Sequence, residues 1–313
     1  MPCLVRGGEP VSDPHLSPEP VQGLLRFSHQ AMATTFEVLV CHPRPVYAGQ
    51  AAREAFALLN RIEQQLSRFV ENSDASRVNG SRPGQPVLVG PETFECLQQA
   101  RLAWDLTGGA FDVTVGTRTA PAGMDTLVLD ESTMTVTRAA ESVRLDLGGI
   151  GKGFALDRMA QVLREWGIDV ALVHGGASTV LALDPPPGAQ GWPVTVTCPF
   201  EAAKVLARID LCRRALSGSS QVSRAHILDP CTGTSATAHP CAWSGAPSGA
   251  LADALSTAFV VMGSDGVADL CARDHQIGAL LIQRTPAPGK VLCESIALGL
   301  WPGRDGTIPC RCP

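Results

Sequence analysis

The stretch Asp146-Leu-Gly-Gly-Ile-Gly-Lys-Gly153 leaves an expected strand at 142–147 and enters an expected helix at 151–166. Its glycines let a ligand come close to the backbone, and the first turn of a helix presents N–H groups to an anion. The segment therefore predicts either an anion-binding loop or a structural turn between a strand and a helix. Taken alone, it fits both interpretations.

The order of residues in this segment excludes two familiar phosphate-binding loops. A P-loop needs a glycine five positions before Gly151 and a Ser or Thr after Lys152, but Asp146 and Gly153 stand there. A dinucleotide-binding fingerprint needs its third glycine at position 154, which holds a phenylalanine. An anion loop at this place therefore belongs to another kind of fold.

The spacing of apolar residues, with Pro and Gly at the ends of segments, predicts the elements around this loop. Helices are expected at 48–69, 91–106, 151–166 and 248–262, with a short helix capped by Ser73 or Asp74. Strands are expected at 32–40, 126–129, 142–147, 170–173, 193–198, 206–211 and, as the last one, 279–282. Residues 217–220 are expected to form a flexible polar loop. Helices and strands mix without a strict βαβ rhythm, so we predict an α+β fold with mixed, largely antiparallel sheets flanked by helices.

The ends of the chain differ in composition from its middle. Residues 1–22 are rich in Pro and Gly and predict a disordered leader, residues 23–300 one domain, and residues 301–313 a tail. No apolar stretch approaches the roughly 20 residues that span a bilayer, and neither a signal peptide nor a lipobox is visible. A cytoplasmic location and no transmembrane segment are therefore expected for the chain as given.

Composition narrows the classes of function. With 45% hydrophobic and 18% charged residues, the 313-residue chain is typical of a globular protein. A net charge of −5 without basic runs gives no reason to expect a nucleic-acid partner. The 11 cysteines are an odd number scattered along a long chain, which argues against a disulfide framework.

Three further segments carry side chains that suit phosphate chemistry. The segment Gly109–Thr114 places an acid and a hydroxyl on alternating positions after a glycine turn. His226 is expected on a strand that holds its imidazole at the rim of a sheet. Asp253 and Thr257 are four residues apart on an expected helix and so share one face, where they can bind Mg²⁺. Each has an ordinary alternative, a packed histidine or a solvated helix face.

Taken together and in order, these segments resemble the ApbE family of FAD:protein FMN transferases. The likeness runs through Met32–Phe36, Leu66–Phe69, Asn79, Phe111–Gly116, Asp146–Asp157, Val173–Gly176, His226–Gly233 and Ala252–Thr257. The resemblance implies transfer of FMN from FAD to a Thr or Ser hydroxyl of an acceptor protein, with Mg²⁺ as cofactor and release of AMP. Relatives of this kind are often exported and anchored to membranes.

The resemblance also implies the residues of the site. Those for FAD are Met32, Phe69, Ala110, Phe111, Asp112, Asp146, Lys152 and Ile227. Those for Mg²⁺ are the backbone carbonyl of Gly149 and the side chains of Asp253 and Thr257. His226 and Asp253 are the catalytic candidates, and His226 is the preferred base because a metal-bound carboxylate is a weak one.

Three positions depart from the usual pattern of the family. Cys231 replaces an arginine, Ala177 replaces Asp or Asn, and Leu216 replaces a threonine. We expect these departures to affect the rate of transfer more than the binding of FAD. They leave two alternatives open, an FAD pyrophosphatase that releases FMN and AMP, and a non-catalytic flavin-binding protein.

Overall fold

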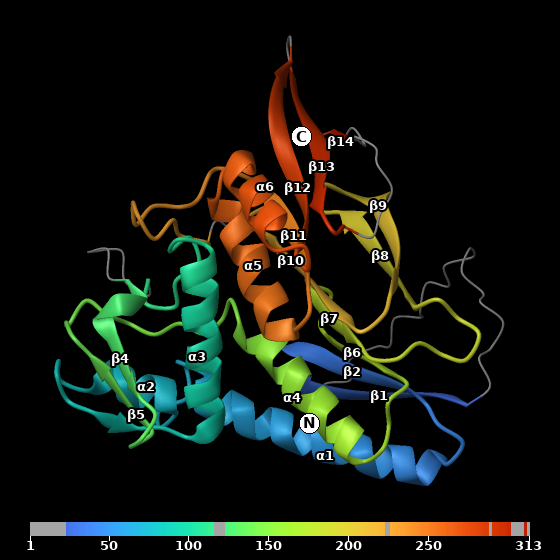
Figure 1. Cartoon of the computed structure of the whole chain (residues 1–313), viewed down its shortest axis with the longest axis horizontal. Coiled ribbons are helices and arrows are strands. Elements are labelled where there is room, and N and C mark those ends of the chain that lie inside the picture. Colours follow the sequence, from blue (N-terminus) through green and yellow to red (C-terminus); the bar gives the residue numbers. More distant parts are fainter. Residues whose placement is uncertain (1–22, 116–122, 223–225, 288–289, 302–309, 312–313) are drawn as a thin grey trace, which may run out of the picture.

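The computed structural model describes residues 23–115, 123–222, 226–287, 290–301 and 310–311 (Figure 1). The expected leader, residues 1–22, and most of the expected tail lie outside the described residues. The division into leader, domain and tail therefore stays a prediction.

The helices and strands of the described residues have the following bounds. The helices are α1 (Pro45–Leu66), α2 (Asp74–Gly80), α3 (Pro91–Leu106), the 3-10 helix η1 (Met124–Thr126), α4 (Gly151–Glu165), α5 (Gly249–Val261) and α6 (Ser264–Arg273). The strands are β1 (Leu24–Ala31), β2 (Thr34–Cys41), β3 (Val87–Leu88), β4 (Leu127–Asp130), β5 (Thr135–Arg138), β6 (Ala171–Gly175), β7 (Thr179–Ala182), β8 (Trp192–Cys198), β9 (Glu201–Leu211), β10 (Arg214–Ser220), β11 (Cys241–Ala246), β12 (Gly278–Ala287), β13 (Lys290–Gly299) and β14 (Cys310–Arg311).

The strands form one large sheet and two small ones. The large sheet has nine strands in the order β1-β2-β6-β7-β10-β11-β12-β13-β14, and each neighbouring pair in it is antiparallel. The small sheets are β3-β5-β4 and the β8-β9 hairpin. This arrangement confirms the predicted α+β fold with largely antiparallel sheets.

The large sheet separates two apolar clusters because successive residues of a strand point to opposite faces. Leu172 and Val173 are neighbours in β6 but belong to different clusters, and the same holds for Ala215 and Leu216 of β10. One cluster contains side chains of α1, α3, α4 and α5, and the other contains those of the β8-β9 hairpin. Helices therefore cover one face of the sheet and the hairpin covers part of the other.

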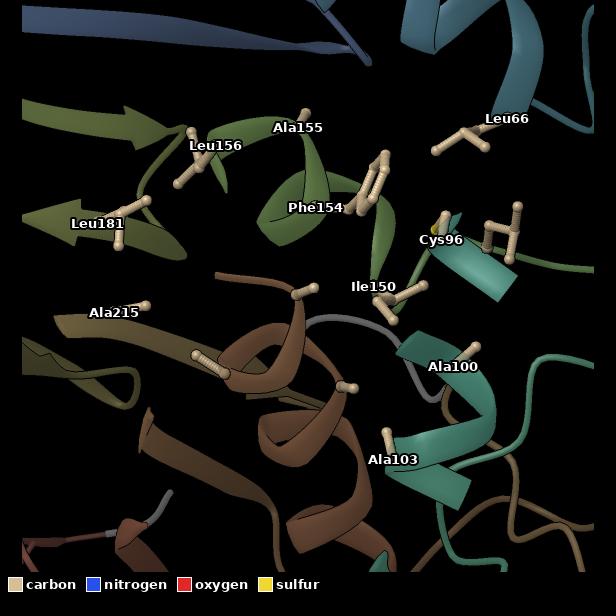
Figure 2. Packing of buried hydrophobic residues seen from close by; sticks show 14 of the residues in the cluster. Leu66, Cys96, Ala100, Ala103, Ile150, Phe154, Ala155, Leu156, Leu181 and Ala215 are labelled. Atoms are coloured by element: carbon tan, nitrogen blue, oxygen red, sulfur yellow. The ribbon is translucent and has the colours of Figure 1, made fainter. Parts of the chain in front are cut away.

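Helix α5 lies at the centre of the helical layer (Figure 1) and contacts α3, α4, β10 and β11. Its sequence, GALADALSTAFVV, is apolar on nearly every side, which is typical of a helix buried all round. Small side chains let the neighbouring helices come close. Figure 2 shows the cluster beside it, where Phe154 of α4 and Ile150 lie with Cys96 and Ala100 of α3.

Helices α4 and α5 cross at two glycines, Gly153 and Gly249. A Cβ built on Gly153 would lie 1.9 Å from the carbonyl oxygen of Gly249, and one on Gly249 would lie 2.4 Å from that of Gly153. Two backbones can come so close only where neither residue has a side chain. The glycine that the sequence places at the third position of α4 is therefore a packing requirement.

Most of the predicted helices are confirmed with small shifts of their ends. Helix α3 has the expected bounds, α1 begins and ends three residues earlier than expected, and Ser73 caps α2 by accepting a hydrogen bond from Ser76 N. Pro45 stands at the first turn of α1, a position that suits a residue without an N–H.

The strand predicted over 32–40 is confirmed from Thr34 onward as part of β2, but its first two residues do not belong to a strand. Met32 and Ala33 form a two-residue turn between β1 and β2, with φ angles of 49° and 57°. Residues with positive φ at both positions are typical of tight hairpins, but Asn or Gly is usual there. Because Met and Ala do not signal such a turn, the sequence pattern missed it.

The strand predicted at 142–147 is also wrong, apart from one bridge between Arg144 and Val115. The backbone of Leu145 bonds instead to the side chain of Asn79, whose Oδ1 accepts its N–H at 2.6 Å and whose Nδ2 donates to its carbonyl at 3.0 Å. The buried guanidinium of Arg138 donates to the carbonyl oxygens of Ala140 and Val143. Apart from the backbone bonds of Arg144 N and Asp146 N to the carbonyls of Thr114 and Val113, side chains take the place of a neighbouring strand.

Two further predictions, one of a loop and one of a strand, need correction. Residues 217–220, expected as a flexible loop, belong to β10 and pair with β11. The strand at 279–282 is part of the longer β12 and is followed by β13 and β14.

We expect Gly153→Ala to destabilise the fold by about 3 kcal/mol, because the new methyl group meets backbone that cannot rotate away. Chemical denaturation of the purified variant measures this change. The matched control is Gly80→Ala at the end of α2, where a Cβ meets nothing within 4 Å and the change should stay below about 1 kcal/mol. Equal stabilities of the two variants would contradict the role of the crossing.

Candidate functional site

A cavity of about 490 Å³ opens where the glycine loop, α5, β10 and the 226–230 segment meet. It is lined by Arg68, Phe69, Ala110, Phe111, Asp112, Val115, Asp146, Gly148, Gly149, Lys152, Ser178, Gly218, Ser219, Ser220, His226, Ile227, Leu228, Pro230, Asp253 and Thr257. With the exception of Met32, this set contains every site residue that the sequence predicted. Segments far apart in the chain thus meet around one space.

Met32 lines a second, more apolar cavity of about 480 Å³, which shares Arg68, Phe69, Asp146, Gly148 and Lys152 with the first. The two cavities therefore adjoin. The ring of Phe69 is 85% exposed, and the guanidinium of Arg68 lies 4.8 Å from its centre. Arg68 Nε also lies 3.4 Å from the carboxylate of Asp146, which ties this rim to the glycine loop.

Asp253 lies at the floor of the first cavity and is only 2% exposed. Its carboxylate accepts hydrogen bonds from Gly153 N at 3.1 Å and Ser217 Oγ at 3.0 Å. Lys152 Nζ lies 3.5 Å from both of its oxygens. These donors stabilise a negative charge that burial would otherwise make unfavourable.

The glycine loop differs in one respect from a simple anion-binding helix terminus. The N–H of Gly151 donates to the carbonyl of Leu147 at 2.8 Å, and the N–H of Gly153 donates to Asp253. Two N–H groups of the first turn are therefore already bonded within the protein. The side chain of Lys152, which lines the cavity, supplies positive charge for an anion instead.

Thr257 and Gly149 lie beside Asp253 in the same cavity. A Cβ built on Gly149 would lie 3.2 Å from Thr257 Oγ1, a tight contact, so the loop comes close to α5 at this glycine. The Thr257 hydroxyl donates to the carbonyl of Asp253 at 3.3 Å, one turn earlier in the helix. A carboxylate, a hydroxyl and a backbone carbonyl are oxygen donors of the kind that Mg²⁺ prefers.

This donor set is not a cluster of classical metal ligands. Within the described part of the chain, no group of three or more His, Cys, Asp or Glu side chains is arranged to hold a metal ion. A site with one carboxylate suits Mg²⁺, which is commonly bound by one or two protein carboxylates together with substrate phosphates. The residues therefore fit this cation in the presence of a diphosphate.

Asp112 lines the cavity together with Ala110 and Phe111. Its Oδ1 accepts hydrogen bonds from Thr114 N at 2.7 Å and Thr114 Oγ1 at 2.6 Å. Burial raises the pKa of this carboxyl, and the bonds from Thr114 and from the side chain of Trp104 only partly offset the effect. The acid is thus fixed by its neighbours and faces the ligand space.

His226 lies at the exposed mouth of the cavity, and Ile227 beside it is buried. The prediction that His226 stands on a strand is wrong, since it is not part of a strand and the described residues that follow it form only an isolated bridge between Leu228 and Ser235. A compact turn follows, in which Gly233 N donates to the carbonyl of Asp229 at 2.8 Å. The histidine thus lines the cavity from a segment that ends in a turn and is not part of a sheet.

The family model described as the ApbE family matches residues 32–281. The chain belongs to the ApbE family. FAD:protein FMN transferases of Haemophilus influenzae and Treponema pallidum are 24% and 28% identical to it, over 84% and 80% of this chain and 87% and 82% of theirs. The range that the family model matches contains every residue that lines the first cavity.

Solved structures of the family share this fold. The flavin transferase ApbE of Vibrio cholerae has a TM-score of 0.76 at 23% identity and covers 88% of this chain and 97% of its own. The ApbE protein of Thermotoga maritima has a TM-score of 0.73 at 26% identity, over 82% and 94% of the two chains. No helix among the described residues is both long and apolar enough to cross a membrane.

Of the three departures from the family pattern, Ala177 and Cys231 lie at the edge of the cavity, whereas Leu216 is buried in β10 within the second apolar cluster. Ala177 is exposed in the turn between β6 and β7, next to the cavity residue Ser178. Cys231 is exposed in the turn after Pro230, and its N–H donates to Asp229 Oδ1 at 2.9 Å. Neither replacement disturbs the floor formed by α4 and α5.

Sequence reasoning missed a chain of hydroxyl groups beneath this ApbE-family site. Thr179 and Ser217 hydrogen-bond with each other at 3.0 Å, and both reach Asp253 Oδ1. Ser219, at the cavity wall, hydrogen-bonds with Ser256 at 2.8 Å and with Thr257 at 3.2 Å. The hydroxyl groups of Ser217-Gly-Ser-Ser220 were not predicted to lie there, because a strand of small polar residues has the composition of a loop.

We expect Ser217→Ala to lower the free energy of unfolding by about 1–2 kcal/mol, because a fully buried carboxylate oxygen loses a donor. Urea denaturation measures the change. Ser132→Ala removes an exposed hydroxyl and serves as the control, with an effect within about 0.5 kcal/mol. A Ser217 variant as stable as the control would show that the hydroxyl does not support Asp253.

Proposed function

We propose that this protein is an Mg²⁺-dependent FAD:protein FMN transferase. It takes FMN from FAD, attaches it through a phosphoester to a Thr or Ser hydroxyl of an acceptor protein, and releases AMP. The observation that carries the proposal is that the family's segments converge on one cavity, where Lys152, Asp253, Thr257 and His226 meet. The names of the relatives support the same activity.

The two adjoining cavities provide the space for FAD. Each has a volume in the range of roughly 300–1,000 Å³ that is typical of ligand sites. The apolar side chains of Met32, Phe69, Phe111 and Ile227, with Ala110, suit the two ring systems. Asp112 and Asp146 offer acceptors to polar edges of the ligand, and Lys152 attracts its diphosphate.

Asp253, Thr257 and the carbonyl of Gly149 are the residues that would hold Mg²⁺. The cation supplies neutralisation of the negative charge that develops on the phosphates as AMP leaves. Lys152 acts in the same direction from its place 3.5 Å from the Asp253 carboxylate. Because Asp253 already accepts hydrogen bonds from the protein, its carboxylate is held in one orientation before any ligand arrives.

His226 is the proposed general base. The oxygen of the acceptor hydroxyl attacks the phosphorus of the FMN half, and the bond from that phosphorus to the oxygen of AMP breaks. The imidazole takes the proton of the hydroxyl, and AMP leaves with the electron pair of the broken bond. An exposed histidine at the mouth of the cavity suits this role because a protein acceptor must approach from outside.

Incubation of the pure protein with FAD and Mg²⁺, with and without a peptide that carries the acceptor Thr, tests the proposal. We expect the peptide to gain the mass of FMN less one water, AMP to appear in equal amount, and EDTA to stop both. A peptide with Val in place of that Thr is the matched control. Release of FMN and AMP without peptide would instead indicate a pyrophosphatase, and intact FAD throughout would indicate a flavin-binding protein.

We expect His226→Ala to keep FAD binding within a few fold and to lower the transfer rate by about 10²–10⁴-fold, the usual contribution of a general base. Fluorescence of the bound flavin measures the first quantity and peptide mass the second. His29→Ala, on β1 and outside both cavities, is the control and should leave both unchanged. Near-normal transfer by the His226 variant would refute its role as the base.

A further inference from the structure

Asp157 is an ionisable group for which the proposed reaction has no direct use. It lies on α4, four residues after Gly153, and is not among the residues that line the site cavity. Burial raises the pKa of its carboxyl to about 6, although the N–H groups of Ala250 and Gly249 act to lower it. A partly buried charge is unfavourable unless its contacts compensate, so these contacts need an explanation.

Both oxygens of Asp157 bond to the beginning of α5. Oδ1 accepts from Gly249 N at 2.7 Å and Oδ2 accepts from Ala250 N at 2.8 Å. Ser248 Oγ accepts from Leu251 N at 3.3 Å and completes the cap. The first N–H groups of a helix have no partner within the helix, so a neighbouring carboxylate that binds two of them fixes where the helix starts.

Helix α5 makes a matching contact with the start of α4. Asp253, four residues after Gly249 on α5, accepts a hydrogen bond from Gly153 N in the first turn of α4. Each helix thus offers a carboxylate to the first turn of the other, and the crossing of Gly153 with Gly249 lies between the two contacts. Sliding or rotation of α5 against α4 would break both carboxylate contacts at once.

Asp253 and Thr257 lie one and two turns beyond Gly249 on this same helix, while Gly149 precedes α4. The relative position of the two helices therefore decides whether the oxygen atoms of all three residues face one another. Asp157 holds the start of α5, one turn before Asp253 on the same helix.

We propose that Asp157 is a positioning residue of the cation site. It acts through α5, by fixing the start of that helix so that Asp253 and Thr257 face Gly149, and it does not itself contact cation or substrate. The inference rests on the proposed function, since it takes these three residues as the ligands of Mg²⁺.

The test measures cation affinity directly, apart from turnover. Mn²⁺, a probe that favours the same carboxylate and carbonyl ligands, is titrated into protein saturated with FAD, and free Mn²⁺ is followed by electron paramagnetic resonance. Asp157→Asn keeps the size of the side chain but only one acceptor oxygen. We expect its dissociation constant for Mn²⁺ to rise on the order of tenfold or more, as for other groups that orient metal ligands.

A control separates positioning from a general loss of stability. Leu163→Ala removes a fully buried side chain of α4 in its last turn, far along the helix from the cap. Measured below the melting temperature of both variants, it should bind Mn²⁺ like the unsubstituted protein even if it melts earlier. Equal weakening in the two variants would overturn the proposal.

Asp157→Glu, which keeps both oxygens on a longer side chain, is the second variant if Asp157→Asn does not fold. It should weaken Mn²⁺ binding in the same direction but by a smaller factor. Unchanged affinity in the folded Asp157 variants would overturn the positioning role while leaving transferase activity of the unsubstituted protein intact. Failure of the unsubstituted protein to bind Mn²⁺ would overturn the cation site itself, and the positioning role with it.

Discussion

The contact between Gly153 and Gly249 is the constraint on which the rest of the site depends. It brings the backbones of α4 and α5 closer than any side chain would allow, and a carboxylate from each helix bonds to the first turn of the other. The sheet supports this pair from one side, because α5 packs on β10 and β11 and α4 packs on β6 and β7. The position of the cavity floor follows from these contacts, before any ligand is considered.

The side chain of Asp253 has both a structural role and a role in the proposed cation site. A carboxylate that is 2% exposed would be strongly unfavourable if its oxygens lacked donors. Gly153 N, Ser217, Thr179 and Lys152 surround it, so the fold stabilises the charge that the proposed cation site needs. The same burial means that a change at this residue affects stability and binding together, which is why its neighbours are better probes of its role.

The sequence predicted which residues lie together around the cavities better than it predicted the details of the fold. Helices with a clear apolar stripe, such as α1, or with clear end signals, such as α3, were placed within a few residues. The hairpin at Met32 and the irregular segment around Leu145 were missed, because their backbone groups are satisfied by an unusual turn and by the side chain of Asn79. The turn lacks the Asn or Gly that usually marks it, and the partner of Leu145 lies 66 residues away, so no local pattern of residues signals either feature.

The role of Asp157 was invisible in the sequence for a related reason. Its spacing from Gly153 places both on one face of α4, but nothing local indicates that the partner of that face is the start of another helix almost a hundred residues later. In contrast, Phe69 and His226 stand at the exposed side of the cavities, away from this crossing. The site thus combines a floor fixed by backbone contacts with a mouth formed by exposed side chains. A rigid floor suits a diphosphate and its cation, whose charges demand fixed distances, and an exposed mouth suits a protein acceptor that must enter and leave.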